Sequence, residues 1–159
     1  MWKRSNKAEL FKKLKSEIDT QLQLAVDAVQ VTLDVATHEE NKPENKYDTR
    51  GLEASYLARA QSERVLDLKA VKVVIDSLKM RDFSHGQPIA VSALIQLETN
   101  GKTLWVLLLP KGGGQSFEFN NVSIKVITPE SPLGSQLVGK TVDDSVEIKH
   151  TVYDIIAVH

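Results

Sequence analysis

The stretch His38-Glu39-Glu40-Asn41-Lys42-Pro43-Glu44-Asn45-Lys46-Tyr47-Asp48 separates two long segments that both have the character of helices. It contains the first proline of the chain, and a proline inside a helix removes a backbone hydrogen bond and clashes with the preceding turn. We therefore expect the two segments to form an antiparallel helical hairpin with this acidic, polar stretch at its tip.

The segment before the tip has neither glycine nor proline between residues 1 and 41. Its apolar residues recur three or four positions apart, which is typical of one face of an α-helix. We expect a helix from near Asn6 to the tip, about 50 Å long at 1.5 Å per residue. The apolar positions are Leu10, Leu14, Ile18, Leu22, Ala25, Val29, Leu33 and Ala36.

The charges of this first helix are sorted along its length. No Lys or Arg lies between Ser16 and Asn41, so a basic start is followed by an acidic remainder. This segregation leaves two interpretations open, a solvated helix face or a binding surface. The basic residues are Lys3, Arg4, Lys7, Lys12, Lys13 and Lys15, and the acidic ones are Glu17, Asp19, Asp27, Asp34, Glu39 and Glu40.

A second apolar stripe follows the tip, where Asp48 or Thr49 can serve as the N-cap of a helix. Two stripes of similar length can bury each other as a two-stranded antiparallel coiled coil. Because the core of an isolated helix pair is thin, we expect the rest of the chain to anchor the base of the hairpin. The stripe runs through Leu57, Ala58, Gln61, Val65, Leu68, Val71, Ile75 and Leu78.

The helical period stops at residues 82–88, so we place a domain boundary there, with a hairpin domain at 1–81 and a β domain at 82–159. Short aliphatic and β-branched runs separated by turn residues indicate strands in the second domain. Asn100-Gly101 is a hairpin turn signal, and residues 131–139 predict a short helix with Ser131 as N-cap and Gly139 at its end. The predicted fold is α+β, a helical hairpin followed by a small, mainly antiparallel β domain. The expected strands are Ile89 to Leu97, Leu104 to Leu109, Val122 to Thr128, Ser145 to Lys149 and Val152 to Val158.

Composition excludes several classes of protein. No apolar run approaches the roughly 20 residues that span a bilayer, and the basic start leads into a mixed sequence, so we expect a cytoplasmic protein without a membrane partner. The absence of cysteine excludes disulfides, thiolate catalysis and cysteine-bearing zinc sites. The four histidines show no metal-ligand spacing, and the glycine cluster at 111–115 lacks the pattern of a phosphate loop and predicts a turn.

The candidate functional residues that remain after these exclusions lie at the tip. Exposed carboxylates are oxygen ligands suited to Mg²⁺, which commonly takes one or two protein carboxylates and shares its other positions with water or phosphates. Such a tip becomes useful when it enters a site that already holds phosphate and a first metal. The alternative is that these charges only solubilise the turn. Tyr47 is a candidate for contact with a partner, because a tip has little core to join.

Three pieces of the β domain carry a resemblance to a known family: Ser131-Pro132-Leu133-Gly134, Leu137-Val138-Gly139-Lys140 and Asp143-Asp144-Ser145-Val146. At this mutual spacing they resemble the FKBP-like C-terminal domain of the bacterial Gre transcript-cleavage elongation factors. The tip agrees, since Glu44-Asn45-Lys46-Tyr47 resembles the family's Glu-Asn-Ala-Glu-Tyr, one residue shorter. The resemblance extends over nearly the whole chain.

The resemblance implies a monomeric accessory factor that docks on bacterial RNA polymerase and inserts its hairpin into the secondary channel. There the tip would help the polymerase hydrolyse backtracked RNA by helping to hold a second Mg²⁺. Nascent RNA would then be an indirect partner, reached through the polymerase active site. Glu44 matches the family's glutamate and is the candidate catalytic and metal-binding residue. Glu40 is the candidate second carboxylate.

The tip also departs from the family pattern, which is Asp-Leu-Ser-Glu where this chain has Asn41-Lys42-Pro43-Glu44. The neutral Asn41 replaces an aspartate, and this favours the alternative of a channel-binding regulator that does not stimulate cleavage. A third reading takes the FKBP-like domain as a prolyl isomerase or chaperone. Few aromatic residues support an apolar proline pocket there: Trp105, Phe117, Phe119 and Tyr153.

Overall fold

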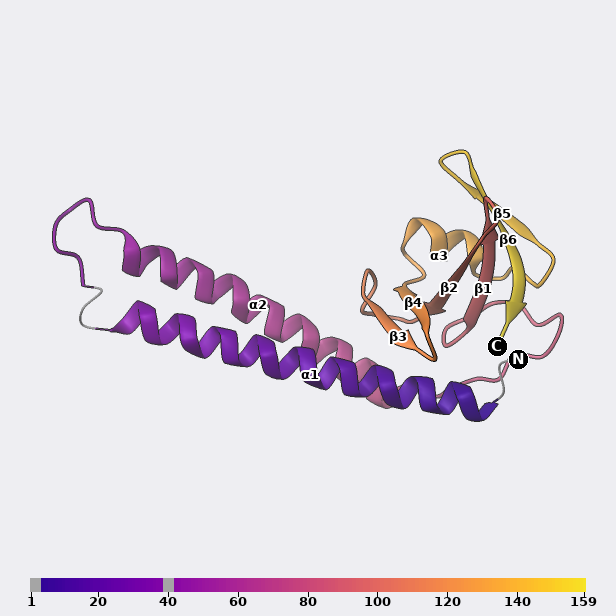
Figure 1. Ribbon diagram of the computed structural model, residues 1–159, viewed down its shortest axis with the longest axis horizontal. Coiled ribbons are helices and arrows are strands. Elements are labelled where there is room, and N and C mark those ends of the chain that lie inside the picture. The colour runs from indigo at the N-terminus through magenta and orange to yellow at the C-terminus, as the bar shows by residue number, and fades with distance from the viewer. Residues whose placement is uncertain (1–3, 39–41) are drawn as a thin grey trace. The chain divides into compact units, whose positions relative to one another are not determined.

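The computed structural model of the chain describes residues 4–38 and 42–159. Two long helices, α1 (Arg4–Thr37) and α2 (Arg50–Ser77), come first, and a six-stranded sheet with one short helix follows (Figure 1). The predicted α+β order is therefore confirmed. The chain forms two compact units, one made of Ser16–Lys72 and one made of Val73–His159 with the start of α1 up to Lys15.

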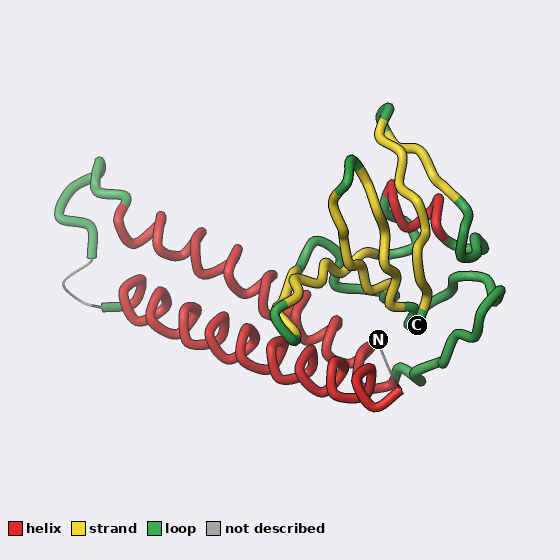
Figure 2. The backbone as a smooth tube through the Cα atoms, turned by 45° about the vertical axis from the view of Figure 1, so that its right-hand side comes forward, coloured by secondary structure: helices red, strands yellow, loops and turns green. Residues whose placement is uncertain are grey.

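The unit Ser16–Lys72 is the helical hairpin, in which α1 and α2 run side by side in opposite directions (Figures 1 and 2). The predicted stripes face each other, since Ile18, Ala58 and Leu68 are buried. An ion pair of 2.7 Å between Asp19 and Lys72 joins the two helices. Nearer the tip the two helices pack less closely. Leu33 and Leu57 of the predicted stripes are 42% and 53% exposed, so the prediction of burial is wrong at these two positions. Among the residues that the structure describes, no helix is both long and apolar enough to cross a membrane.

The sheet has the strand order β3-β4-β2-β1-β6-β5. Its neighbouring strands pair antiparallel, except that β2 and β4 are parallel. This mixed pairing agrees with a mainly antiparallel domain. The strands are β1 (Leu94–Thr99), β2 (Lys102–Leu108), β3 (Ser116–Phe119), β4 (Val122–Ile127), β5 (Ser145–Ile148) and β6 (Thr151–Val158).

Two-residue turns connect three antiparallel strand pairs, and both residues of each turn have positive φ. The predicted turn at Asn100-Gly101 has φ values of 49° and 69°, and Asn120-Asn121 has 51° and 60°. Such turns match the twist of the strands they join, and Asn and Gly tolerate this conformation best. Lys149-His150 adopts it as well, at 47° and 65°, without that sequence signal.

One strand prediction needs correction, and one strand was not predicted. The run Ile89 to Leu97 forms a strand only from Leu94, because Ser92 has a φ of 77° and interrupts the extended backbone. Ile89 is buried without being in a strand, and its N–H donates to the carbonyl of Lys140 at 2.8 Å. Strand β3 was not predicted, since its four residues follow the glycine-rich turn and present only two apolar side chains.

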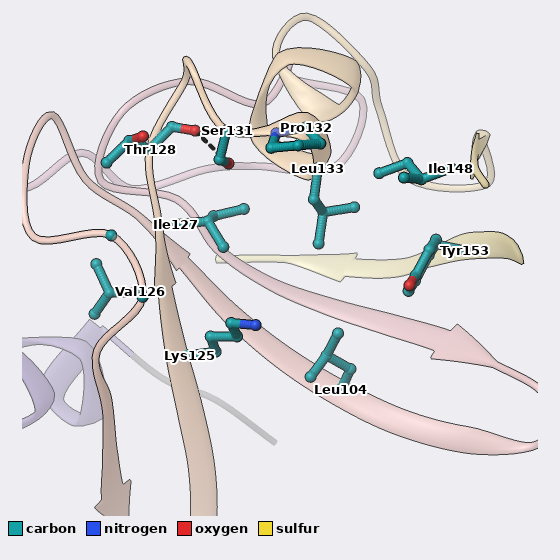
Figure 3. A pocket seen from close by; sticks show the side chains of 12 residues that line it. Leu104, Lys125, Val126, Ile127, Thr128, Ser131, Pro132, Leu133, Ile148 and Tyr153 are labelled. Atoms are coloured by element: carbon teal, nitrogen blue, oxygen red, sulfur yellow. Dashed lines mark hydrogen bonds between the residues drawn. The ribbon is translucent and has the colours of Figure 1, made fainter.

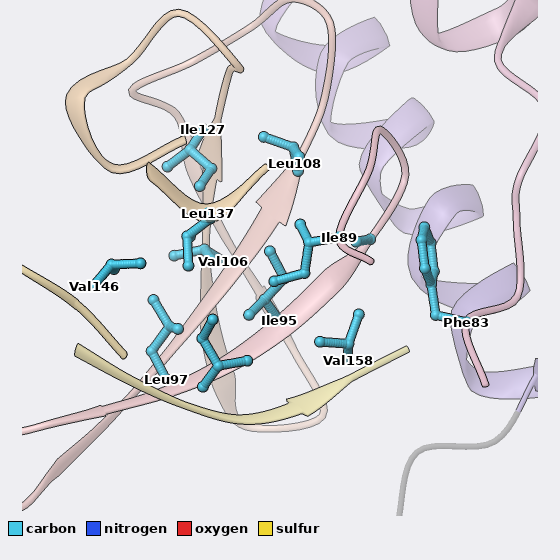
Figure 4. Packing of buried hydrophobic residues seen from close by; sticks show 12 residues of the cluster. Phe83, Ile89, Ile95, Leu97, Val106, Leu108, Ile127, Leu137, Val146 and Val158 are labelled. Atoms are coloured by element: carbon cyan, nitrogen blue, oxygen red, sulfur yellow. The ribbon is translucent and has the colours of Figure 1, made fainter. Parts of the chain in front are cut away.

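The short helix α3 (Pro132–Leu137) is confirmed with its predicted caps. The Ser131 hydroxyl accepts the N–H of Gly134 at 3.0 Å, and Gly139 follows the helix with a φ of 81°. Gly134 lies so close to the main chain that a Cβ there would be 1.9 Å from the carbonyl oxygen of Thr128. Leu137 fixes the helix over one face of the sheet (Figure 4). That face presents Ile95, Leu97, Val106, Leu108, Ile127 and Ile155.

The start of α1 is buried in the unit that also holds the sheet, where Leu10, Phe11 and Leu14 are each at most 3% exposed. Lys7 is buried too, and its ammonium donates to the carbonyl of Arg81 and, at 2.8 Å, to that of His159. These bonds join the start of α1 to the segment after α2 and to the residue after β6. The start of the hairpin's first helix is therefore anchored as expected.

Burial lowers the pKa of the Lys7 ammonium to about 8, against the attraction of Asp82. The ring of Phe83 lies below the ammonium, with 4.9 Å between the Lys7 Nζ and the ring centroid. An ammonium that is taken out of water with few compensating charges favours its neutral form.

We expect Gly134→Ala to lower the free energy of unfolding by about 3 kcal/mol, the upper end of the range for over-packing, because the added methyl group collides with main chain. Chemical denaturation followed by circular dichroism measures this loss. Ser135→Ala in the same helix, at an exposed position, is the control and should change the unfolding free energy by less than about 1 kcal/mol. Equal effects of the two substitutions would contradict the close-packing explanation.

Lys7 gives the stability of the protein a distinct pH dependence. Between about pH 8 and the ordinary lysine value of 10.5, the unfolded chain holds a proton at Lys7 that the folded chain has released, so the free energy of unfolding rises with pH. The rise amounts to about 3 kcal/mol across this window. Denaturation at several pH values should show the rise in the wild type and in the exposed-lysine control Lys12→Met. Its persistence in Lys7→Met would contradict the assignment.

Candidate functional site

The tip of the hairpin lies between the end of α1 at Thr37 and the start of α2 at Arg50. Its described residues from Lys42 to Tyr47 are all exposed, and the Tyr47 side chain, at 79%, is the most exposed large apolar residue reported for the chain's described part. The Lys46 Nζ lies 5.0 Å from the Tyr47 ring centroid, a cation–π arrangement. The tip therefore offers an aromatic ring and a cation to solvent.

Asp48 organises the tip through both of its carboxylate oxygens. Its Oδ1 accepts the backbone N–H of Arg50 at 3.3 Å and the Arg50 Nε–H at 3.2 Å. Its Oδ2 accepts the Arg50 Nη2–H at 3.2 Å and the backbone N–H of Glu44 at 3.4 Å. The hydrogen bonds from Arg50 are the main reason why the pKa of the Asp48 carboxyl falls to about 2. The negative charge of Asp48 is thus already paired with the positive charge of Arg50.

The main chain between Glu44 and Asp48 closes into a turn. The Asp48 N–H donates to the carbonyl of Asn45 at 3.1 Å, and the Tyr47 N–H donates to the Asn45 Oδ1 at 2.8 Å. An asparagine side chain that binds the N–H two residues later is a common way to stabilise a turn. Pro43 lies just before this turn, six residues after α1 ends at Thr37.

Glu44 is exposed, and among residues 42–159 its carboxylate has no hydrogen bond or close ion pair. Its negative charge still acts on Arg50, whose pKa is raised mainly by Asp48 and to a smaller extent by Glu44. Glu40, the other predicted ligand, and Asn41 lie outside the described residues. Within the described ranges, no three His, Asp or Glu side chains gather as a metal site. With Asp48 bound to Arg50, the described tip fits Mg²⁺ only as the donor of a single carboxylate to a shared ion.

The sequence offered Asp48 or Thr49 as the helix cap, but the pairing of Asp48 with Arg50 was not predicted. The available signal was the Asp-x-Arg spacing directly before a helix, where the guanidinium can fold back onto the carboxylate. A guanidinium that meets a carboxylate through two N–H groups is a strong, directional pair. The signal is weak by itself because arginine has many rotamers.

The β domain contains a groove of about 610 Å³ beside α3 (Figure 3). Its apolar lining comes from several elements and includes Leu104, Ile127, Leu133 and Ile148. Tyr153 is the one aromatic side chain among the described residues that line it. The Ser131 hydroxyl at its rim donates to the carbonyl of Thr128 at 2.7 Å. No local sequence signal marks this groove, since its residues converge only through the sheet topology.

Comparison with known proteins finds similar folds among solved structures only. No protein-family model matches the sequence, and no curated relative is found. GreA factor homolog 1 (Gfh1) of Thermus thermophilus is 19% identical, with 91% of this chain and 94% of that chain covered and a TM-score of 0.37. Gfh1 of Thermus aquaticus is 21% identical, with 98% and 95% covered and a TM-score of 0.36.

A prokaryotic transcription elongation factor GreA/GreB from Nitrosomonas europaea is also similar. It is 12% identical, with 67% of this chain and 91% of that chain covered and a TM-score of 0.35. At such identities and TM-scores the likeness decides nothing about function, which has to be argued from the residues of this chain.

We expect the Asp48 carboxyl to stay ionised down to about pH 2, which a titration followed by the carboxyl ¹³C chemical shift can measure. Arg50→Ala should raise the pKa toward the ordinary aspartate value of 3.8, because Arg50 supplies the main stabilising hydrogen bonds. The contribution of the Asp48–Arg50 pair to stability is thus complete above pH 3.8 and is lost as the pH falls through about 2. Arg59→Ala, which removes an exposed α2 ion pair with Glu63, should leave the midpoint unchanged. A wild-type midpoint near 4 would contradict the pairing.

Proposed function

We propose that the protein is a cytoplasmic transcription elongation factor that binds bacterial RNA polymerase and inserts its hairpin tip into the secondary channel. The observation that carries this proposal is the exposed Glu44 carboxylate on a structured turn at the end of a helical hairpin. Of the charged groups at the described tip, Glu44 and Asp48 are the acids, and only Glu44 is available to an ion in another active site. The similarity of the tip and β-domain motifs to the Gre factors supports the same reading.

The hairpin delivers one carboxylate, and the polymerase supplies the rest of the reaction centre. Mg²⁺ held jointly there would orient and activate the water that attacks the backtracked RNA. Glu44 would contribute an oxygen ligand, and the closed turn from Glu44 to Asp48 would hold that ligand in place. A single carboxylate binds Mg²⁺ weakly, so the chain acts as an accessory factor and not as an enzyme by itself.

The charge distribution of α1 supports insertion with the tip foremost. Its residues beyond Ser16 include acids and no Lys or Arg, whereas the start of the helix is basic. An acidic tip is attracted to a catalytic centre rich in cations, and a basic start can meet acidic polymerase surface or emerging RNA. The exposed Lys12 and Lys13 are the described candidates for the second contact.

A second candidate function is a secondary-channel regulator that occupies the channel without stimulating cleavage. The pairing of Asp48 with Arg50 favours it, because that pairing leaves Glu44 as the one carboxylate of the described tip that is not hydrogen-bonded to an arginine. Such a factor would alter nucleotide access or initiation through its bulk and charge.

Purified backtracked transcription complexes test the two candidates directly. If Glu44 is a metal ligand, the protein and Mg²⁺ should shorten the RNA faster than polymerase alone. Glu44→Ala should then reduce the accelerated rate by about tenfold or more, since a loss of ~1.4 kcal/mol in transition-state stabilisation gives tenfold. Glu63→Gln on α2 is the matched control at an exposed glutamate.

The outcomes separate cleanly. Binding to polymerase with no change in cleavage selects the regulator. Binding with acceleration that Glu44→Ala does not affect would show that another group is the ligand. The absence of binding in a co-sedimentation experiment would overturn both candidates.

A further inference from the structure

We propose that Asp48 and Arg50 form a clamp that positions Glu44, an inference that rests on the proposed function of the tip. The two acidic residues of the described tip would then have different roles. Glu44 presents its carboxylate to the partner site, while Asp48 acts on Glu44 and touches neither metal nor RNA.

The hydrogen bonds of Asp48 support this division of roles. An ionised carboxylate has about four lone-pair sites. Arg50 fills three of them, through its backbone N–H, its Nε–H and its Nη2–H, and the Glu44 N–H fills the other. The Asp48 side chain is only 11% exposed. Asp48 therefore has no oxygen lone pair left for a metal ion, in contrast to Glu44.

The contact with Glu44 connects the clamp to the proposed ligand. Asp48 holds the main-chain N–H of Glu44, and the Asp48 N–H binds the Asn45 carbonyl. These two hydrogen bonds fix the main chain of the turn from Glu44 to Asp48. The fixed backbone restricts the directions in which the Glu44 side chain can point. A side chain whose conformation is already restricted loses less conformational entropy when it binds. A Glu44 carboxylate held in this way would therefore bind its partner ion more tightly.

Arg50 extends the clamp to a rigid element. It is the first residue of α2, and its backbone N–H and side chain both donate to Asp48. The turn that carries Glu44 is consequently fixed to the start of a helix and not left as a free loop. Sites supported from regular elements hold their geometry better than sites on unsupported loops.

A double-mutant cycle tests whether Asp48 acts through Glu44. Its readout is the RNA cleavage rate at saturating factor or, for a factor without cleavage activity, the change that saturating factor causes in polymerase activity. We expect Asp48→Ala to weaken the effect about tenfold, with the half-saturating concentration changed less than twofold. Combined with Glu44→Ala, it should add nothing, because removing a ligand makes its positioning irrelevant. Independent, multiplying effects would overturn the proposal.

Arg50 supplies a rescue arm in the same assay. Arg50→Ala should match Asp48→Ala, and Arg50→Lys should recover part of the effect, since lysine restores the charge but not the planar fork. Arg59→Ala is the matched control, because it removes an exposed arginine that pairs with Glu63 on the same helix. A loss in Arg59→Ala as large as that in Arg50→Ala would indicate a general charge effect and overturn the clamp.

The free protein gives a readout that does not depend on the proposed function. In ¹H–¹⁵N spectra, Asp48→Ala should shift the Glu44 amide signal and speed its hydrogen exchange, whereas Glu44→Ala should leave the Arg50 Nε–H signal in place. An unchanged Glu44 amide in Asp48→Ala overturns the clamp. If the wild type fails to bind or affect polymerase, the proposed function fails, and the amide signals alone decide whether Asp48 positions residue 44.

Discussion

The burial of the start of α1 is the constraint on which the rest of the structure depends. Two helices alone bury little apolar surface. Near the tip the contact between α1 and α2 is sparse, since Leu33 of the predicted stripe is partly exposed. Firm burial occurs at the other end, where Leu10, Phe11 and Leu14 lie in the same compact unit as the sheet and Lys7 binds two distant carbonyl groups. Among the described residues of α1, all the buried ones lie between Lys7 and Ile18.

The parts of the fold that follow from local periodicity were predictable from the sequence. The two helices, the Asn100-Gly101 turn and the capped helix α3 each have a signal within a few residues. The parallel pairing of β2 with β4 could not be foreseen, because it joins strands across a glycine-rich turn and another strand. The buried but irregular position of Ile89 was also missed, since its hydrogen bonds come from residues 139 and 140, far along the chain.

The candidate site was predictable in position but not in chemistry. Charge and proline content located the tip, whereas the neutralisation of Asp48 depends on a rotamer of Arg50 that no pattern specifies. At the β-domain motif, by contrast, the sequence resemblance has a structural explanation. Gly134 belongs to the sequence that most resembles the Gre factors, yet its contact with the Thr128 carbonyl explains its presence by packing alone. Similarity at such a residue reflects the backbone packing that a glycine allows.

The order of the strands has a further consequence for how the protein behaves at high concentration. Both outer strands of the sheet, β3 and β5, have only four residues. An edge strand exposes unpaired backbone groups that can recruit another chain, and short edges limit this recruitment. Alternate residues of both strands are exposed and include Glu118 and Glu147, whose like charges oppose the approach of a second edge. The sheet is thereby protected against open-ended growth into aggregates.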